Sequence, residues 1–384
     1  MVKKVKINLV MFNMSSYSEW QKGIQNRNFH ILITLLNNEN INKIIAIDYL
    51  PHTLKRVIKN YKENNLNKEY KVIHKSLLTK VYEIDKRLII YSSILSFFNK
   101  KLFYINLNKF LNSIKITKYY LWSYYPLDVS YYNYLKPNLK IFDAVDDWSL
   151  HPSYSKFKNK IIDNYKIINE KSDLIFTVSD ELQNLFDNNV YWVPNGVDVK
   201  HYQQEYPIIN RDIGSLTKPI IGYVGTVQER FDAELLEFIA KENKDKSIVI
   251  IGPIWLTEIK NKLSKYSNIF LLGRKSYQEI PMYLQQFDVG IIPHKIDKFV
   301  KSTNPMKMYE YLACGKPIVS TSGSGIEVFK ESIYITNDYR EFNHFIQETL
   351  RDNNQKLINE RLDIIKEHSW LKRTEKMLEI IKNY

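Results

Sequence analysis

The stretch "STNPMKMYEYLACGKPIVS", residues 302–320, predicts a loop, a helix and a strand in close succession. Just upstream, "DVGIIPH" (288–294) is a short apolar run of the kind that forms a strand buried on both faces. Asn304 followed by Pro305 predicts a helix start, because the amide can cap the helix and the fixed φ of proline suits its first position. Gly315 and Pro317 predict the end of this helix. The unit is strand, loop, helix, strand.

This helix has two different faces. Met308 and Leu312 lie on an apolar face, whereas Thr303, Lys307 and Glu310 fall on a polar face that starts at the helix N-terminus. A helix N-terminus binds phosphate through unpaired backbone N–H groups, and Lys307 adds a full charge. Glu310, one turn further in, is then placed to accept from the two hydroxyls of a nucleotide ribose. An exposed Lys–Glu pair at i,i+3 is the open alternative.

Length and composition predict two domains and a reducing environment. A chain of 384 residues is too long for one core, and 44% hydrophobic residues suffice for two. The single cysteine, Cys314, cannot form an intramolecular disulfide, and no metal-ligand spacing surrounds it. The apolar run within "MVKKVKINLVMFNM" (1–14) is too short for a signal peptide or a membrane span, and we expect it to form the first buried strand. Any membrane contact is therefore expected to be peripheral.

The positive charge is concentrated in the first half of the chain. Of the net +13, +11 belongs to residues 1–200 and +2 to residues 201–384. Much of it lies in "HTLKRVIKNYKENNLNKEYKVIHKSLLTKVYEIDKRL" (52–88), where lysines alternate with apolar and aromatic residues. Such a surface suits nucleic acid, an anionic membrane or an acidic substrate, and a merely solvated face is the alternative. No zinc-finger, RNP or DNA-reading pattern is present, which disfavours nucleic acid.

Apolar runs and helical stretches alternate along the whole chain. In the first half, "KINLVMF" (6–12), "NKIIAID" (42–48), "KYYLWSY" (118–124), "LKIFDAV" (139–145), "DLIFTVS" (173–179) and "VYWVP" (190–194) predict strands. After a polar linker around 203–217, strands are predicted at 219–227, 247–252, 269–273, 288–294 and 317–321. We therefore expect an α/β protein with two parallel, helix-covered sheets, Rossmann-like, facing each other across a cleft. Ligands bind such sheets outside the carboxyl ends of the strands.

Three short motifs fall at or near those carboxyl ends. "GYVGTVQERFD" (222–232) places Gly225 and Thr226 directly after a strand, with Arg230 close behind, and this favours diphosphate binding over a plain connection. "LGRKSY" (272–277) adds Arg274, with a basic surface loop as the alternative. "VPNGVD" (193–198) joins the two halves and suits a hinge.

Together these motifs, with "LGRKSYQEIPMYLQQFDVGIIP", "NPMKMYEYLACGKPIVST" and "IFDAVDDW", resemble those of GT-B glycosyltransferases of the family-4-like group (group 1). Within that group the chain is similar to the glycosyltransferases of teichuronic acid and capsular polysaccharide synthesis. The resemblance extends over nearly the whole chain. It implies that the second domain binds a nucleotide sugar and that Glu310 holds the ribose.

The chain departs from that family at one position. Many members have two glutamates separated by seven residues, and the first of them contacts the sugar. In this chain Glu310 matches the second, and Ser302 stands eight positions before it, in place of the first. Ser302, Thr303 and Asn304 are the expected substitutes. The stereochemical outcome, retaining or inverting, stays open.

The first half is expected to bind the acceptor. "DAVDDW" (143–148) follows a strand and offers Asp146 and Asp147 as candidate catalytic bases and Trp148 as a platform for a sugar ring. The alternative is that one aspartate caps the next helix and that the tryptophan belongs to the core. Arg27 and His30, in the loop and helix that follow the first strand, are further candidates for contacts in the cleft.

These expectations combine into one predicted function. Residues 1–198 form the acceptor domain, 199–367 the nucleotide-sugar domain, and 368–384 a helix that packs back on the first domain. The protein is predicted to be a cytoplasmic, metal-independent glycosyltransferase without a cofactor, peripheral on the inner face of the membrane. It would move a sugar from a UDP-linked donor to a hydroxyl of a surface polysaccharide or lipid-linked glycan. A non-hydrolysing nucleotide-sugar epimerase and a non-catalytic glycan-binding protein remain as alternatives.

Overall fold

The computed structural model describes residues 6–66, 70–206, 212–323 and 325–384, which form two compact units. Unit 1 comprises the chain up to Thr177 together with Leu182–Val193 and Thr374–Tyr384, and unit 2 comprises Val178–Glu181 and Pro194–Arg373. The predicted domain boundary at residue 198 lies five residues inside unit 2. Part of the predicted linker, 207–211, is outside the described residues. The predicted placement of the two sheets across a cleft stays a prediction.

Unit 1 is built on a mixed sheet with the strand order β3-β4-β5-β2-β1-β6-β7-β8-β9. Its strands are β1 (Ile7–Phe12), β2 (Ile41–Ile47), β3 (Lys71–Lys75), β4 (Thr79–Glu83), β5 (Leu88–Ser93), β6 (Tyr120–Ser123), β7 (Leu139–Ala144), β8 (Leu174–Thr177) and β9 (Val190–Trp192). From β5 to β9 all neighbours are parallel, but β4 pairs antiparallel with both β3 and β5. The prediction of an entirely parallel sheet is therefore wrong at this edge, where lysines alternating with apolar residues form an edge strand instead of a helical face.

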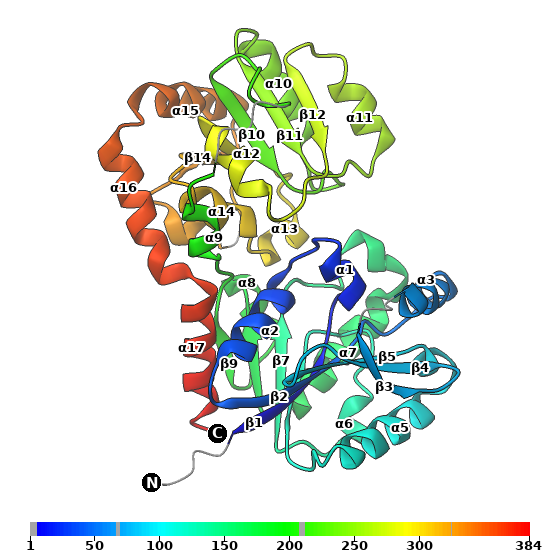
Figure 1. Ribbon diagram of the computed structural model, residues 1–384. Coiled ribbons are helices and arrows are strands. Elements are labelled where there is room, and N and C mark those ends of the chain that lie inside the picture. Colours follow the sequence, from blue (N-terminus) through cyan, green and yellow to red (C-terminus); the bar gives the residue numbers. More distant parts are fainter. Residues whose placement is uncertain (1–5, 67–69, 207–211, 324) are drawn as a thin grey trace. The chain divides into compact units, whose positions relative to one another are not determined.

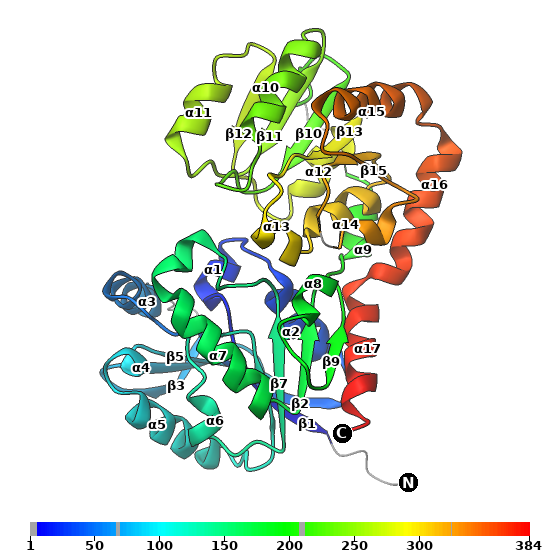
Figure 2. The same cartoon turned by 180° about the vertical axis from the view of Figure 1, so that it is seen from behind.

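The helices of unit 1 cover both faces of this sheet. They are α1 (Tyr17–Gln21), α2 (Arg27–Asn37), α3 (Leu54–Leu66), α4 (Leu95–Phe98), α5 (Lys100–Ser113), α6 (Tyr131–Tyr134), η1 (Pro152–Phe157) and α7 (Lys158–Lys171), with α8 (Asp180–Gln183) after β8. Figure 1 shows α2 in front of the sheet and Figure 2 shows α7 in front of the opposite face. The end of the chain also belongs to this unit, since Lys376 donates to the Trp192 carbonyl and Tyr384 bonds Tyr191.

Unit 2 has a parallel sheet with the strand order β12-β11-β10-β13-β14-β15. Its strands are β10 (Ile220–Val224), β11 (Ser247–Ile251), β12 (Ile269–Gly273), β13 (Val289–Ile292), β14 (Ile318–Ser320) and β15 (Tyr334–Ile335). Counted along the chain this is the order 3-2-1-4-5-6 of a dinucleotide-binding sheet, in which ligands bind where the order reverses. The reversal lies between β10 and β13.

Two sets of helices cover the two faces of the second sheet. The helices of unit 2 are α9 (Val199–Gln203), α10 (Ala233–Glu242), α11 (Thr257–Leu263), α12 (Ile280–Gln286), α13 (Lys298–Ser302), α14 (Met306–Ala313), η2 (Glu327–Phe329), α15 (Tyr339–Asp352), α16 (Gln355–Ile364) and η3 (Ile365–His368), and α17 (Trp370–Ile381) follows. Helices α10, α11 and α15 contribute to one buried cluster, and α9, α12 and α14 to the other. In the described part of the chain no helix is long and apolar enough to cross a membrane.

Helix α14 packs very closely against the sheet. A Cβ atom at Gly290 of β13 would overlap the ring of Tyr311, and one at Gly222 of β10 would overlap the ring of Phe287. The Tyr311 hydroxyl accepts a hydrogen bond from the Val224 N–H, with an N–O distance of 2.7 Å. Glycine in these two strands thus gives room for aromatic rings, and Tyr311 fixes α14 against the carboxyl end of β10.

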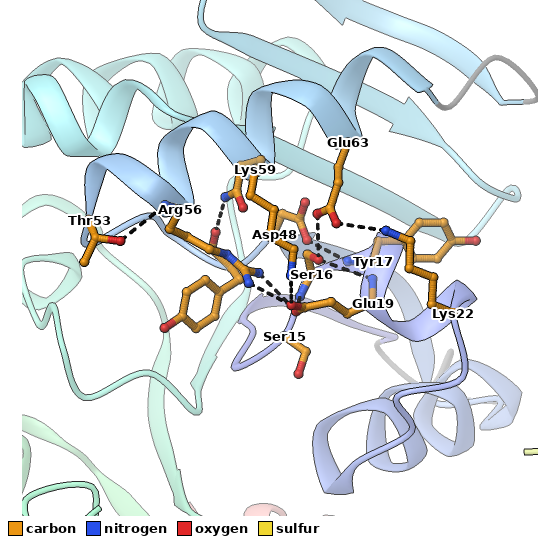
Figure 3. A network of polar contacts seen from close by, with 12 residues as sticks. Ser15, Ser16, Tyr17, Glu19, Lys22, Asp48, Thr53, Arg56, Lys59 and Glu63 are labelled. Carbon is orange, nitrogen blue, oxygen red and sulfur yellow. Dashed lines mark hydrogen bonds and ion pairs between the residues drawn. The ribbon is translucent and has the colours of Figure 1, made fainter. Parts of the chain in front are cut away.

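In unit 1, a network of charged side chains joins α1 to α3 (Figure 3). Both terminal nitrogens of Arg56 donate to Glu19, at 2.7 and 3.0 Å, and Lys59 donates to the same carboxylate at 2.7 Å. Only about 15% of the Arg56 and Glu19 side chains is exposed. Burial raises the pKa of Glu19, but the bonds from Arg56 and Lys59 outweigh it and hold this pKa well below its usual range.

We predict that Glu19→Gln lowers the free energy of unfolding by about 2 kcal/mol, because it leaves Arg56 without its bidentate partner. The carboxylate stabilises the fold above its ordinary pKa, and this contribution is lost as the pH falls through the depressed value of the folded state. Denaturant titrations at pH 7 and pH 2 measure both effects. Asp163→Asn is the control, because the Asp163–Lys166 pair is about 70% exposed and is expected to contribute little. Equal losses in the two variants would contradict the prediction.

Candidate functional site

The carboxyl ends of β10 and β11 come together through glycine backbone. Gly225 follows β10 with a φ of +146°, and its N–H donates to the Ile251 carbonyl at 2.9 Å. Gly252 follows β11 with a φ of +139°, and a Cβ there would overlap the Gly225 carbonyl. Both conformations favour glycine. They leave bare backbone at the point where the strand order reverses, as a ligand that approaches the main chain requires.

Lys307, in the first turn of α14, reaches this glycine backbone. A Cβ at Gly225 would lie 3.0 Å from Cε and 3.2 Å from Nζ of Lys307. The ammonium group lies 4.8 Å from the centre of the Tyr223 ring and 3.4 Å from Nε2 of His294, and only 8% of Lys307 is exposed. Burial and the charge of Arg230 lower the pKa of Lys307 to about 7, although Glu310 raises it. The protein therefore holds a buried cation without a carboxylate bonded to it in the described residues.

Arg230 adds a second cation at the same place. It is partly exposed, its Nε is buried, and in the part of the chain that the structure describes this atom has no hydrogen-bond partner. The charge of Arg230 also contributes, after burial and Lys307, to a pKa of His294 well below its ordinary value, so this buried histidine is neutral. A buried donor left unsatisfied is costly, and a bound anion would satisfy it.

Glu310 lies one turn further along α14 than Lys307. Burial raises the pKa of Glu310 to about 6, against the opposing effects of a hydrogen bond from Tyr202 and of the Lys307 charge. The predicted polar face of the helix is thus a partly buried one, and the alternative of an exposed Lys–Glu pair does not hold. A carboxylate next to an anion-binding cluster can accept from vicinal hydroxyls.

The arrangement suits a ligand that combines negative charge with hydroxyl groups. Lys307, Arg230 and the N-terminus of α14 supply positive charge and donors, Gly225 permits close approach, and Glu310 supplies acceptors at a fixed distance along the helix. These four residues were predicted from the sequence as site residues, and the structure brings them together in unit 2.

Asn304 does not cap the helix as predicted. Pro305 occupies the N-cap position without a side-chain bond, and α14 begins at Met306. The Asn304 carbonyl oxygen of the side chain accepts from the Asn195 N–H at 2.8 Å and from the Tyr309 hydroxyl at 3.1 Å. Asn304 therefore joins the "VPNGVD" segment to α14, because a buried amide is most stable when its own bonding capacity is filled.

The neighbouring hydroxyl groups also bond to the protein itself. Ser302 donates to the Phe299 carbonyl at 2.7 Å and Thr303 to the Val300 carbonyl at 2.8 Å, both at the end of α13. Their oxygens can still accept, so their predicted contact with a sugar stays a prediction. Thr226 lies at the same sheet edge, with its carbonyl accepting from Tyr223, whereas Arg274 is exposed after β12.

Three residues predicted to bind an acceptor are buried in unit 1. Arg27 is 2% exposed and donates through Nε to Asp143 at 2.9 Å, and His30 is 7% exposed. Trp148 is 4% exposed, and its ring stacks on Tyr154 at a centroid distance of 4.6 Å. Arg27 is thus bonded and Trp148 stacked within unit 1, and the predicted acceptor contacts of Arg27, His30 and Trp148 stay predictions.

The two aspartates differ. Asp147 is buried and accepts from the Ser149 N–H at 2.9 Å and from its hydroxyl at 2.6 Å, so it stabilises the turn after β7. Asp146 is partly exposed, and its carbonyl accepts from the Tyr165 hydroxyl at 3.3 Å. The predicted alternative, in which one aspartate caps the next helix, is wrong for η1, because His151 caps that helix and Asp147 bonds Ser149 within the turn.

His294 and Tyr202 belong to the site although the sequence did not single them out. His294 ends the quoted run "DVGIIPH" directly after β13, at the point of reversal of the strand order, so strand-end position was a usable signal. Tyr202 lies in α9, and no local pattern pairs it with Glu310.

Residues 218–352 match the family model described as "Glycosyl transferases group 1". This segment is a group 1 glycosyltransferase domain. It contains Gly225, Arg230, Lys307 and Glu310. Among curated proteins, a protein of Bacillus subtilis (strain 168) named as a teichuronic acid biosynthesis glycosyltransferase, TuaH, is 26% identical over 227 residues. The match covers 55% of this chain and 56% of that protein, so the chain spans about half the length of the curated relative.

Solved structures match nearly the whole chain. Anabaena HepE, in a crystal structure with UDP and glucose, has a TM-score of 0.68 at 12% identity, over 98% of this chain and 100% of that one. A sucrose-phosphate synthase of Thermosynechococcus elongatus also has a TM-score of 0.68, at 13% identity, over 98% and 99% of the two chains. The protein thus has the GT-B fold of these structures, with two α/β units built on largely parallel sheets.

Proposed function

We propose that this protein is a glycosyltransferase that moves a sugar from a nucleotide diphosphate donor, a UDP-sugar, to a hydroxyl group of a surface polysaccharide or lipid-linked glycan. The observation that carries the proposal is the buried Lys307 beside the partly exposed Arg230, whose buried Nε is unsatisfied in the described residues, at the point where the sheet order reverses. The group 1 glycosyltransferase domain, the structure of HepE with UDP and the resemblance to TuaH support it.

In this proposal the diphosphate and the ribose of the UDP-sugar bind to residues of α14 and of the loop that follows β10. The diphosphate lies at Gly225 and the N-terminus of α14, where Lys307 and Arg230 meet its charge, and the ribose hydroxyls donate to Glu310. When the sugar leaves, the diphosphate gains negative charge, and the two fixed cations stabilise that charge without the reorganisation that water would need. The positive charges thus take the part that a metal ion has in other transferases.

The acceptor hydroxyl must lose a proton during transfer. If the reaction inverts, Asp146 is the candidate base of unit 1, because Asp147 already accepts two hydrogen bonds from Ser149. If the reaction retains, no such base is required. Ser302 stands where a sugar-facing glutamate is common in the resembling family, so the donor sugar meets a neutral hydroxyl there.

We predict that Glu310→Ala weakens UDP binding by roughly 10- to 100-fold, in line with about 1.5–3 kcal/mol for hydrogen bonds to a charged group. Isothermal titration calorimetry measures the affinity. Glu258→Ala is the matched control, since Glu258 is an exposed glutamate in the first turn of α11. A folded Glu310→Ala variant that binds UDP as tightly as the wild type would reject the ribose role.

The two shifted groups predict a narrow pH optimum for the binding of UDP-glucose. Below about pH 6 Glu310 takes up a proton and loses acceptor capacity, and above about pH 7 Lys307 loses its charge. Affinity should therefore fall on both sides, by at most about tenfold per pH unit. Glu310→Gln should remove the acid limb and Lys307→Met the alkaline limb. Identical profiles in the wild type and in both variants would show that neither group titrates with binding.

For the membrane, we propose a peripheral contact through α3. Leu54, Ile58 and Tyr61 follow one another along this helix and are 65%, 56% and 48% exposed, and Lys55 and Lys62 are also exposed. Exposed apolar residues beside lysines are typical of a helix that lies in a membrane interface. Arg56 and Lys59, which the sequence placed in the same basic surface, bond to Glu19, so they contribute less charge than predicted.

We predict that the protein binds anionic vesicles of phosphatidylglycerol and that binding falls steeply between low and physiological salt. The double variant Leu54→Ser with Ile58→Ser should weaken vesicle binding at every salt concentration, because it removes apolar side-chain area that the membrane would bury. Lys55→Gln with Lys62→Gln should weaken it mainly at low salt. Trp255→Ser, which removes an exposed apolar residue of unit 2, is the control. If the fraction of protein that sediments with vesicles is the same in the wild type and in both double variants, α3 does not bind the membrane, and a dissolved acceptor is favoured over a lipid-linked one.

A further inference from the structure

A cavity of about 140 Å³ lies within unit 1, apart from the residues assigned above to the donor. Leu50, Pro51 and His52 line it just after β2, Ser96 and Phe97 just after β5, and Tyr125, Leu127 and Asp128 just after β6. Strands β2 and β6 flank β1 in the sheet, and the strand order reverses between β1 and β6. The cavity therefore occupies the part of this α/β sheet where ligands usually bind.

The charged groups of the cavity carry an excess of positive charge. Lys100 and Lys160 both line it, and Asp128 is the one acidic residue among the lining side chains. Lys100 lies 3.3 Å from Asp128, whereas Lys160 has no bonded partner among the described residues. Lys160 is exposed, and its partial desolvation at the cavity wall and the nearby Lys100 lower its pKa, against the attraction of Asp128. An anion between the two lysines would relieve this repulsion.

Two neutral donors complete the polar wall. The hydroxyl of Ser96 is buried, and in the described residues it has no hydrogen-bond partner, although the residue is only 4% exposed. His52 is neutral, because burial, Arg56 and Lys160 lower its pKa to about 4. Its Nδ1 lies 3.1 Å from the Tyr49 hydroxyl, which leaves Nε2 for a ligand. A serine hydroxyl left unsatisfied beside two ammonium groups has the features of an oxyanion site.

Tyr49 links this wall to the charged network of Figure 3. The Arg56 guanidinium lies over the Tyr49 ring at 4.3 Å from its centre, and Glu19 holds that guanidinium in place. The orientation of His52 is thus fixed by packing and by hydrogen bonds outside the cavity. A site held in this way before the ligand arrives does not spend binding free energy on ordering its side chains.

The remaining wall is apolar. Phe97, Tyr125 and Phe157 line the cavity with Leu50 and Leu127. Such walls exclude water and strengthen the attraction between an anion and the lysines. The volume is similar to that of an engineered cavity of roughly 150 Å³ that admits benzene, so a phosphate group with part of an adjoining ring fits, and a whole oligosaccharide does not.

We propose that this cavity binds a single oxyanion group, a phosphate or a carboxylate, through Lys160, Lys100, Ser96 and His52. Resting on the proposed function, this group is the charged substituent of the acceptor glycan, and the cavity selects acidic acceptors over neutral ones. Lys160 contributes the charge that no acidic side chain bonds, and Ser96 contributes the unused hydroxyl.

The test uses the full-length protein saturated with UDP, so that the cations of unit 2 are occupied. Inorganic phosphate, glucuronate and glucose are titrated by calorimetry. We expect phosphate or glucuronate to bind and glucose not to bind, and the charged probe that binds identifies the group. Lys160→Ala and Ser96→Ala should each weaken that binding roughly 10- to 100-fold. Lys158→Ala, an exposed lysine two residues earlier in the chain, should leave it unchanged.

Stability and UDP affinity separate the possible failures. Ser96→Ala removes a buried hydroxyl without a partner, so it should keep or raise the melting temperature without anion and lose the stabilisation that the anion gives to the wild type. Absence of binding by both charged probes, or equal affinity in wild type, Lys160→Ala and Ser96→Ala, would overturn this proposal. If UDP still binds in those cases, the proposed glycosyltransferase function stands. If the wild type does not bind UDP, the proposed glycosyltransferase function is rejected, and the anion site is judged by the phosphate and glucuronate titrations.

Discussion

The contact of Tyr311 with Gly290 and Val224 fixes α14 against the sheet, and this helix carries Lys307 and Glu310 of the candidate donor site. The ring lies where a Cβ of residue 290 would stand, and its hydroxyl accepts from the N–H of Val224. The packing of the ring on Gly290 fixes the distance of the helix from the sheet, and the hydrogen bond to Val224 fixes the position of the helix along its own axis. Because Lys307 and Glu310 belong to the same rigid helix, their distance from Gly225 is set by this one contact. A larger residue at position 290 would move both.

Several buried or half-buried charged side chains of unit 1 are paired with opposite charges, whereas in unit 2 Lys307 lies near another positive charge. In unit 1, Glu19 is bonded by Arg56 and Lys59, which hold its pKa low, so this charge stabilises the native structure. Arg27 is bonded to Asp143, whose pKa burial raises. In unit 2, Lys307 is buried near a second cation, and burial lowers its pKa. A protein of marginal stability retains such an arrangement at a cost, and binding of an anion would offset it. At the cavity of unit 1 Lys160 and Lys100 also lie near each other, but both are exposed, so their repulsion is weaker.

This contrast separates structural charges from those available to ligands. The terminal nitrogens of Arg56 already donate to Glu19, although Arg56 Nε has no partner in the described residues, whereas neither Arg230 Nε nor the Ser96 hydroxyl belongs to a bonded pair there. Both unsatisfied groups lie beside lysines and close to the carboxyl ends of strands. Arg27 is paired with Asp143 and Trp148 is stacked on Tyr154, and their predicted acceptor contacts stay predictions.

The sequence by itself determined most of the alternation of strands and helices, the two sheets and the polar face of α14, because buried parallel strands are continuous apolar runs and helix geometry fixes which residues share a face. It missed β5, although that strand is buried throughout. It did not determine the edge strands β3 and β4, whose lysines alternate with apolar residues as a solvated surface also does. Only the tertiary structure decided that Trp148 is core, that Tyr202 bonds Glu310 and that Lys160 shares a cavity with Ser96. These relations join segments far apart in the chain, and no local pattern encodes which buried polar groups remain without a partner.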